Sequence, residues 1–597
     1  MIDSSLLIFK NNWKKCLMIF FSFTFIFVVF DILMGNVVVS VYSSKLFSLV
    51  YVIVFSSIIL LLPKKLGIFI YTLLYFLLSF IMIAQVFHYQ ALGVFFGVTD
   101  LTNFSEGLTF ISFVKGMVTT KLVIFIALII ATYVVTLICL LKTKKNIKNK
   151  YVYIFKMTYV ILVVIIALLL HNKAVNSLGP KTKEVSLFYD IRSERNIYEG
   201  FVNRNACMQL TQIYEYTFRD AYLYIKKTLS SDNKAMHAEI KEYLNQNKKS
   251  NQRNDYTGLL KDQNLIYILM ESIDSWLVTD EIMPTLSEMK KTGLNFENHY
   301  APIFGGGRTF NTEFAANTGL YIPINGYNIN NSVNNNFDIS LANLFKEKGY
   351  TVNSIHAHFG YFYNRTKIHK TFGYENSYFL ADDNPDIDFY VDTNLVKNNT
   401  TYKYIVPNDN FMTFIITYSG HGKYDETNYM CPVEVRKNEI DCIKYLAGIT
   451  DDFIKLLVKR LEKDNLLDNT TLVLFTDHYA YGYNDIEYLK QQKQVQEPKD
   501  IEKVPFIIWN NNIGAKTIDK ISDTADILPT VANLFGVNWN PNNYLGTDIF
   551  SKDAENFVYF NDYTYVSQTD ENLSNKIAKK IDINDKILIS DYFRYNK

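Results

Sequence analysis

Acidic residues and histidines follow four short apolar runs in the second half of the chain, and each of these runs is a candidate strand. One such residue at a strand end is usually a solvated loop residue, but four repeats of this placement are harder to dismiss. Ligands of open α/β sheets bind at the carboxyl ends of the strands, so these groups are expected to converge there. Carboxylates and imidazoles together suit Mn²⁺, Mg²⁺ or Zn²⁺ and not a metal that prefers thiolates. The residues are Glu271 after LIYILM, His356 and His358 after TVNSI, His421 after MTFIIT, and Asp477 with His478 after TLVLF.

The segment GGGRTFNTEF, from Gly305 to Phe314, is a candidate nucleophile site. Its three glycines let the backbone approach a ligand closely, and a helix that starts after them favours an anionic oxygen at its N-terminus. Thr309 lies at that junction. A neutral threonine hydroxyl is a poor nucleophile, but metal coordination favours its alkoxide and activates it for attack on phosphorus. A flexible glycine turn with an N-cap threonine is an equally good interpretation of this segment alone.

The elements that must position these residues alternate along the chain. From about Asn264 onward, short apolar runs and amphipathic helical segments follow one another, which is the pattern of an α/β fold with a largely parallel sheet. The stretch from Phe557 to Lys597 is expected to form a small α+β subdomain with a charged helix and short strands, YFRY among them. The predicted strands are Leu265–Met270, Thr351–Ile355, Met412–Thr417, Thr471–Phe475 and Val504–Trp509, and the predicted helices are Ser340–Lys348, Ile440–Leu461 and Ala525–Phe535.

The first 170 positions are crowded with apolar residues, whereas the rest of the 597-residue chain carries most of the Asp, Glu, Asn and His. Five segments there have the length and apolarity of a bilayer-spanning helix, which needs about 20 residues. The first is too long for the apolar part of a signal peptide and no small-residue cleavage pattern follows it, so we expect a retained helix. The five segments are Cys16–Met34, Leu46–Leu62, Leu66–Phe87, Leu122–Leu141 and Val152–Leu170.

Basic residues mark one side of this predicted membrane domain. Because Lys and Arg accumulate on the cytoplasmic side of membrane helices, the N-terminus and two basic loops are expected inside, and everything after the fifth helix outside. The basic residues are Lys10, Lys14 and Lys15 before the first helix, Lys64 and Lys65 after the second, and Lys142, Lys144, Lys145, Lys148 and Lys150 after the fourth.

Two connecting segments complete the predicted layout. The stretch from His88 to Lys121 is long and fairly apolar, so a re-entrant or interfacial helix and an ordinary outer loop are equally good interpretations. The polar, helical-looking residues from His171 to Asp255 are expected to tether a soluble domain to the membrane surface.

The charge of the chain argues against one class of partner, and the cysteines allow one disulfide without requiring it. The net charge is +1 and no long run of Lys and Arg occurs, which argues against nucleic acid as a partner. Cys431 and Cys442 bracket a short polar loop in the part expected outside the cell, where a disulfide can persist. A bridge and two unpaired thiols both remain open. The Asn-, Lys- and Ile-rich bias is typical of an AT-rich genome and hints at a low-GC bacterium.

The chain contains, in this order, five membrane helices, NLIYILMES, GGGRTFNTEF, IHAHFGYFYNR, FTDHY, ADILPTVANLFG and YLGTDIFSK. This series strongly resembles the lipoteichoic acid synthase family, whose members are phosphoglycerol transferases of the alkaline phosphatase and sulfatase superfamily. The resemblance covers nearly the whole chain. It implies a five-helix transmembrane domain over residues 1–171, a helical linker over 172–255, an extracellular sulfatase-like catalytic domain over 256–555 and a small C-terminal subdomain over 556–597.

The resemblance also implies roles for individual residues, with Mn²⁺ or Mg²⁺ as the metal and Thr309 as the nucleophile that becomes phosphorylated. Three departures from the family pattern limit this transfer. Arg308 replaces a common lysine, His358 stands where an acidic residue is expected, and Tyr363 replaces a tryptophan. By position, the metal ligands are Glu271, Thr309, Asp477 and His478; the substrate-binding residues are His356, Tyr363, Arg365 and His421; and further candidates are Arg308 and His358.

The function that the resemblance implies is transfer of glycerol phosphate from phosphatidylglycerol to a cell-envelope acceptor. The acceptor could be a glycerol-phosphate polymer, a glycolipid or a polysaccharide, and the enzyme is expected in the cell membrane of a low-GC Gram-positive bacterium. A phosphoethanolamine transferase of the same superfamily is one alternative, and a degenerate, non-catalytic membrane binding protein is another. A sulfatase is disfavoured, because Thr309 is not part of the C/S-x-P-x-R sequence from which formylglycine is made.

Overall fold

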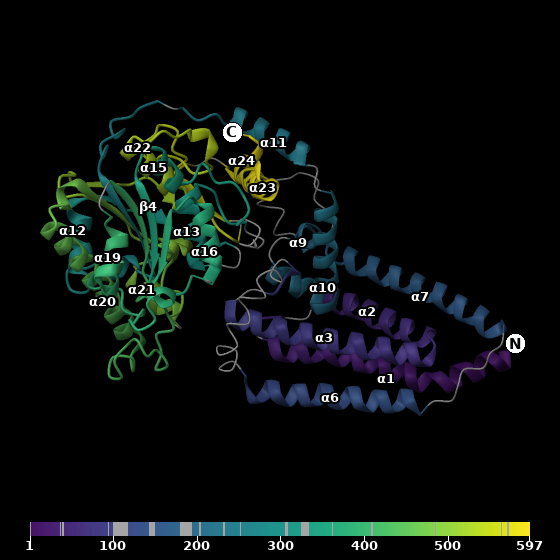
Figure 1. The fold of residues 1–597 in the computed structure, drawn as a ribbon. Helices are drawn as coiled ribbons and strands as arrows, with labels where there is room; N and C mark the ends of the chain where they lie inside the picture. Colours follow the sequence, from purple (N-terminus) through teal and green to yellow (C-terminus); the bar gives the residue numbers. More distant parts are fainter. Residues whose placement is uncertain are drawn as a thin grey trace. The chain divides into compact units, whose positions relative to one another are not determined.

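The computed structural model of the chain describes most of its 597 residues. They form two compact units, residues 1–231 and 232–597, and each is described here by itself. Figure 1 shows the ribbon of both. The described residues are 2–35, 37–38, 41–92, 95–98, 118–142, 150–179, 194–201, 204–230, 233–250, 252–304, 308–323, 333–360, 362–407, 410–483, 485–562, 564–569 and 572–596.

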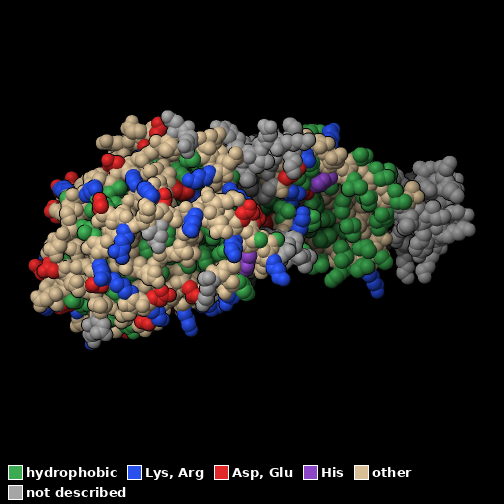
Figure 2. All heavy atoms as spheres, turned by 90° about the horizontal axis from the view of Figure 1, so that it is seen from above, with side chains coloured by type: hydrophobic (Ala, Val, Ile, Leu, Met, Phe, Trp, Pro, Cys, Tyr) green, Lys and Arg blue, Asp and Glu red, His purple; other side chains and the backbone are tan. Residues whose placement is uncertain are grey.

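The first unit contains the five predicted apolar helices. Within the described residues, five helices are long and apolar enough to cross a membrane, which confirms the predicted number. The helices run side by side: α1 contacts α2, α3 and α6, and α2 contacts α7. Figure 2 shows apolar side chains gathered on the surface of this unit, whereas charged side chains are spread over the second unit. The five helices are α1 (Ile2–Met34), α2 (Tyr42–Leu61), α3 (Lys64–Leu92), α6 (Thr120–Leu141) and α7 (Lys150–Asn176).

Residues 172–255, expected as a tether, are largely helical where they are described. They form α9 (Glu194–Gly200), α10 (Arg204–Ser230) and α11 (Asn233–Gln246). Helix α10 packs against α2 of the first unit, and α11 packs against α23 of the second. The domain boundaries themselves stay a prediction. Residues 99–117, the middle of the segment expected to be re-entrant or an outer loop, lie outside the described residues.

The second unit is built on a sheet of eight strands in the order β5-β4-β6-β1-β7-β8-β2-β9. Strands β5, β4, β6, β1 and β7 are parallel, and β8 runs antiparallel to both β7 and β2. This confirms the largely parallel sheet expected from the sequence. The strands are β1 (Asn264–Met270), β2 (Leu294–Phe296), β4 (Thr351–His356), β5 (Asn376–Phe379), β6 (Phe411–Ile416), β7 (Thr470–Thr476), β8 (Phe506–Trp509) and β9 (Lys516–Ile518).

Helices cover both faces of this sheet (Figure 1). The central strand β1 is therefore buried along its whole length. Successive side chains of a strand point to opposite faces. Ile266 and Ile268 therefore join the core under α12 and α20, while the Tyr267 hydroxyl donates to the Ala316 carbonyl of α13 on the other face. The helices are α12 (Pro284–Thr292), α13 (Arg308–Thr318), α15 (Leu341–Glu347), α16 (Arg365–Thr371), α17 (Leu380–Asp383), α18 (Thr393–Lys397), α19 (Asn399–Ile405), α20 (Glu439–Lys463), α21 (Ile486–Gln492) and α22 (Ile527–Phe535).

The C-terminal part has the expected α+β composition, with one correction. Antiparallel strands β11 (Phe557–Tyr559) and β12 (Tyr565–Ser567) precede helix α23 (Ser574–Ser590). The prediction of a strand at YFRY is wrong, because Tyr592–Tyr595 form the short helix α24. Asp591, with a φ of 50°, ends α23 and starts this turn. The aromatic residues favoured a strand in the sequence, but strand propensity depends strongly on whether a partner strand is present. A further two-stranded pair joins β3 (His299–Tyr300) to β10 (Ser522–Asp523).

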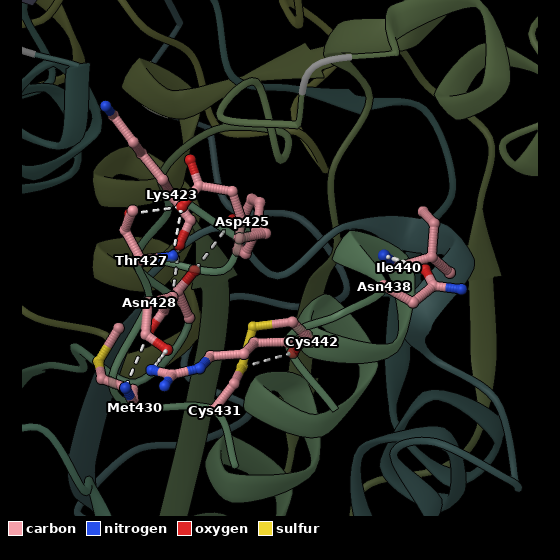
Figure 3. The surroundings of a disulfide bond; sticks show 12 residues. Lys423, Asp425, Thr427, Asn428, Met430, Cys431, Asn438, Ile440 and Cys442 are labelled. Atoms are coloured by element: carbon pink, nitrogen blue, oxygen red, sulfur yellow. Dashed lines mark hydrogen bonds between the residues drawn. A yellow bond between two sulfur atoms is a disulfide. The ribbon is translucent and has the colours of Figure 1, made fainter. Parts of the chain in front are cut away.

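A disulfide joins Cys431 to Cys442, and this settles the alternative left open by the sequence. The two Cα atoms are 5.8 Å apart. The bond fastens the loop after β6 to the first turns of α20 (Figure 3). The Asn438 side chain caps the same helix by accepting from the Ile440 N–H. The loop that carries His421 is therefore attached covalently to a long helix with one buried face.

Candidate metal and phosphate site

The register of two neighbouring strands brings the predicted metal ligands together. Strands β1 and β7 are parallel partners, with Met270 opposite Thr476. The next residues, Glu271 and Asp477, therefore lie side by side at the carboxyl edge of the sheet. One ligand atom from each of Glu271, Asp477 and His478 lies within 4.8 Å of the others. The His478 Nε2 atom is 3.0 Å from Asp477 Oδ2 and 3.7 Å from Glu271 Oε1.

Local hydrogen bonds orient these three side chains. The Ser272 N–H and the His478 N–H both donate to Asp477 Oδ1, each at 2.8 Å. The Ser272 hydroxyl donates to Glu271 Oε1 at 3.0 Å. The His478 Nδ1 atom lies 3.0 Å from the Tyr479 carbonyl oxygen, which can only accept, so Nδ1 carries the proton. This leaves the Nε2 lone pair turned towards the two carboxylates, which is the arrangement that a metal-bound histidine adopts.

The three groups fit a divalent cation on physical grounds. Glu271, Asp477 and His478 are 4%, 1% and 1% exposed. Asp477 Oδ2 and His478 Nε2 have no hydrogen-bond partner within the described residues, although such atoms normally find one when buried. Burial, reinforced by the charge of Asp477, raises the pKa of Glu271 well above its usual range. A cation held by Glu271, Asp477 and His478 would satisfy the unpaired atoms and compensate the two buried carboxylates.

Thr309 lies next to this cluster at the start of α13. Its hydroxyl is buried and donates to Glu271 Oε2 at 3.2 Å. The hydroxyl of Thr312, one turn further on, donates to the Asp477 carbonyl at 2.6 Å and so ties the helix to the loop after β7. The structure thus places the predicted nucleophile beside the predicted ligands. Gly305–Gly307 and the side chain of the candidate Arg308 lie outside the described residues.

The predicted substrate-binding residues His356 and Arg365 are both buried near the same edge. His356 ends β4, and its Nδ1 donates to the Ile416 carbonyl at 3.0 Å, which leaves Nε2 as an acceptor. Burial, together with the charge of Arg365, lowers the pKa of His356 well below its usual range, so the ring is neutral. Arg365 begins α16 and forms an ion pair with Glu313 at 2.8 Å.

Two of the remaining candidates, His358 and His421, belong to a group of stacked rings, whereas Tyr363 lies beside Arg365. Tyr418 stacks on His358 at 4.6 Å and on His421 at 5.1 Å between ring centroids. Burial, with the positive charge of Arg365, lowers the pKa of His358 to about 3, so His358 is neutral near pH 7. The Tyr363 ring lies 5.1 Å from the Arg365 guanidinium carbon.

A glycine brings the loop of His421 against the metal cluster. A Cβ atom on Gly420 would lie 1.9 Å from the Glu271 carbonyl oxygen, so only glycine allows the two loops to meet here. The loops after β1 and β6 are therefore in direct contact, and the predicted residues of both converge on one edge of the sheet.

Comparisons with known proteins give one matching family model and several similar proteins. The family model described as Sulfatase matches residues 263–537. The matching residues lie within the second unit, and this region is called the sulfatase-family domain below. Lipoteichoic acid synthase 2 of Bacillus subtilis (strain 168) is 24% identical over 440 residues, which cover 66% of this chain and 67% of that protein. The lipoteichoic acid synthase of Staphylococcus saprophyticus is 24% identical over 381 residues, 60% of this chain and 58% of its own length.

A solved structure is also similar to part of this chain. It is the lipoteichoic acid synthase LtaP from Listeria monocytogenes, with a TM-score of 0.48 and 21% identity over 60% of this chain and 98% of that one. The two curated relatives named lipoteichoic acid synthase confirm the predicted resemblance to that family. The match spans about three fifths to two thirds of the two curated relatives.

Two polar residues of the sulfatase-family domain were not singled out in the sequence. Glu313 pairs with Arg365, and His369 binds Glu313 Oε1 through Nε2 at 2.7 Å. A signal for each was present: Glu313 lies four residues after Thr309 and His369 four residues after Arg365, which places each pair on one face of a helix.

Proposed function

We propose that this membrane protein is a phosphoglycerol transferase that moves glycerol phosphate from phosphatidylglycerol through Thr309 to a cell-envelope acceptor. The observation that carries the proposal is the buried Thr309 hydroxyl, 3.2 Å from Glu271 in a cluster with Asp477 and His478. The relatives named lipoteichoic acid synthase support the choice of glycerol phosphate as the group transferred.

The proposed reaction has two displacements at phosphorus. The Thr309 oxygen attacks the phosphodiester, a bond forms between this oxygen and phosphorus, and the bond to the diacylglycerol oxygen breaks. That oxygen takes up a proton and diacylglycerol leaves. An acceptor hydroxyl then attacks the phosphorus, loses its proton, and releases Thr309. Glu271 Oε2 is within reach of the Thr309 proton, and the neutral rings of His356 and His358 can accept hydrogen bonds from glycerol.

The residues that would hold the cation are Glu271, Asp477, His478 and the Thr309 oxygen. A bound Mn²⁺ or Mg²⁺ supplies charge neutralisation at the phosphoryl oxygens and favours the alkoxide of Thr309. Arg365 contributes a second positive charge, because its planar guanidinium suits phosphate in a two-point contact.

The proposed location of the sulfatase-family domain is outside the cell. Basic residues flank the loops on the opposite side of the five helices. The Cys431–Cys442 disulfide supports the same side, because disulfides persist in oxidising compartments. The lipid donor and a glycerol-phosphate polymer, glycolipid or polysaccharide acceptor would both be accessible there.

Release of diacylglycerol tests the proposal. The detergent-purified full chain is incubated with phosphatidylglycerol and Mn²⁺, and Thr309→Ala should reduce release to the level without enzyme. Thr400→Ala, at an exposed position on α19, is the matched control and should keep full activity. Equal turnover in Thr309→Ala would overturn the mechanism. Mass spectrometry of the adduct on Thr309 separates the alternative, because phosphoethanolamine and glycerol phosphate differ in mass.

A further inference from the structure

Glu313 is a buried acid inside the candidate site that the proposed mechanism does not use. It lies on α13 one turn after Thr309 and is 0% exposed, and its partner Arg365 on α16 is 3% exposed. The Arg365 Nε atom donates to Glu313 Oε2 at 2.9 Å and Nη2 donates to the same oxygen at 2.8 Å. A buried charge without a partner is strongly unfavourable, so each residue requires the other.

The hydrogen bonds to Glu313 occupy only one edge of the Arg365 guanidinium. This group has five N–H donors, and Glu313 takes the edge formed by Nε and Nη2. The other edge, formed by Nη1 and the second Nη2 hydrogen, has no hydrogen-bond partner among the described residues. Two parallel N–H groups at such an edge match two oxygens of a phosphate.

Further contacts fix the position of this ion pair. His369 Nε2 lies 2.7 Å from Glu313 Oε1, and its Nδ1 lies 2.8 Å from the Ser354 hydroxyl on β4. Burial alone would raise the pKa of Glu313, but the charge of Arg365 and the hydrogen bond from His369 outweigh it and the pKa falls, so the acid is ionised. Glu313 is therefore a fixed negative charge that joins α13, α16 and β4, and not a group that exchanges protons with substrate.

We propose that Glu313 is a positioning residue that holds Arg365 with its free N–H edge towards the phosphoryl group carried by Thr309. The inference rests on the proposed function of the site, because it assigns the phosphate to that function. Glu313 acts through Arg365 and touches neither the substrate nor the metal ligands. Because Glu313 and Thr309 share one helix, the distance between nucleophile and arginine is set by a rigid element.

Binding of inorganic phosphate to the Mn²⁺-loaded full chain tests the inference without turnover. Glu313→Gln keeps the size of the side chain but removes its charge and turns an N–H group towards Arg365. We expect this variant to bind phosphate at least tenfold more weakly and to show a similarly raised KM for phosphatidylglycerol, with Mn²⁺ affinity unchanged. Glu313→Asp, which keeps the charge, should recover part of the loss. Glu288→Gln, an exposed change on α12, is the control and should match wild type.

A double-mutant cycle separates positioning from a general structural effect. In an Arg365→Lys background the two-point contact is already lost, so Glu313→Gln should weaken phosphate binding by less than twofold more. Full additivity of the two changes, or unaltered phosphate binding in Glu313→Gln, would overturn the inference. If Glu313→Gln does not fold, the cycle is run with Glu313→Asp. A wild-type protein that binds phosphate but never releases diacylglycerol would refute the proposed function and leave the inference standing.

Discussion

Replacing Asp477 by asparagine should raise the stability of the metal-free protein and abolish its stabilisation by Mn²⁺. The amide oxygen of the new side chain can still accept the N–H groups of Ser272 and His478, so the local backbone is preserved. The change removes one of two carboxylates whose ligand atoms lie within 4.8 Å. Two unit charges at that distance repel by about 3–4 kcal/mol at an effective dielectric constant of 20. This is an upper bound for the gain, because burial and Asp477 raise the pKa of Glu271 and favour its protonation.

The effect of metal has the opposite sign. A cation that binds only the folded state stabilises it by about 2.7 kcal/mol at a concentration one hundred times its Kd. For a domain of this size we expect an increase in Tm of roughly 3–5 °C in the wild type. The variant lacks one of the four proposed metal ligands and should show almost no increase in Tm with Mn²⁺. With Mn²⁺, the wild type should therefore be the more stable protein. Without Mn²⁺, the variant should be at least as stable as the wild type.

Tryptophan fluorescence during heating measures both effects in the full chain. Three of the four tryptophans, Trp276, Trp509 and Trp539, belong to the second unit, so the signal reports mainly on the sulfatase-family domain. The measurement is made with Mn²⁺ and with a chelator. Retention of the full Mn²⁺ shift in Asp477→Asn would refute the assignment of this cluster. A large loss of Tm in the chelated variant would show that the carboxylates do not repel as calculated.

Three further predictions concern stability. Reducing the disulfide, or changing Cys431 and Cys442 to Ser, should lower the free energy of unfolding in urea by about 3 kcal/mol, as expected for a short closed loop. Cys207→Ser is the control and should not show this loss of a closed loop, because Cys207 forms no disulfide. Burial raises the pKa of Glu555, but Lys580, Lys249 and Lys576 lower it more, to about 2. The stability that ionised Glu555 contributes is complete above pH 4.5 and is lost as the pH falls through 2. In urea titrations at successive pH values, the free energy of unfolding of Glu555→Gln should therefore fall on acidification by about 3 kcal/mol less than that of the wild type. Lys493→Ala leaves Asp274 buried without its cationic partner and should cost about 3–5 kcal/mol, unlike Lys490→Ala at a half-exposed position.

The sequence predicted the strands and the edge at which the site lies. The runs LIYILM and TLVLF became β1 and β7, and the polar residues after them meet because parallel neighbours end together. The same reasoning placed His356 and His421 at that edge. Apolar runs bounded by polar residues suffice for such predictions, because burial on both faces of a sheet leaves few alternatives.

Other features depended on contacts that periodicity does not encode. The antiparallel direction of β8 follows from its pairing with β7 and β2, and a single short strand carries no mark of direction. The helical spacing marks Glu313 in the sequence, but its pairing with Arg365 could not be predicted, since a basic residue in a phosphate site is equally compatible with a free or a paired guanidinium. The sequence did not decide between a disulfide and two thiols, because eleven residues of separation allow a bridge without requiring one.

The order of the strands explains why one carboxylate is central to the site. Strand β1 lies between β6 and β7, so the loop that carries Glu271 has neighbours on both sides. Asp477 and His478 approach it from β7, whereas Gly420 and the ring stack of His421 approach it from β6. Helix α13 then places Thr309 against Glu271 and Glu313 against Arg365. A phosphoryl group on Thr309 would thus have cation ligands on one side and the arginine on the other.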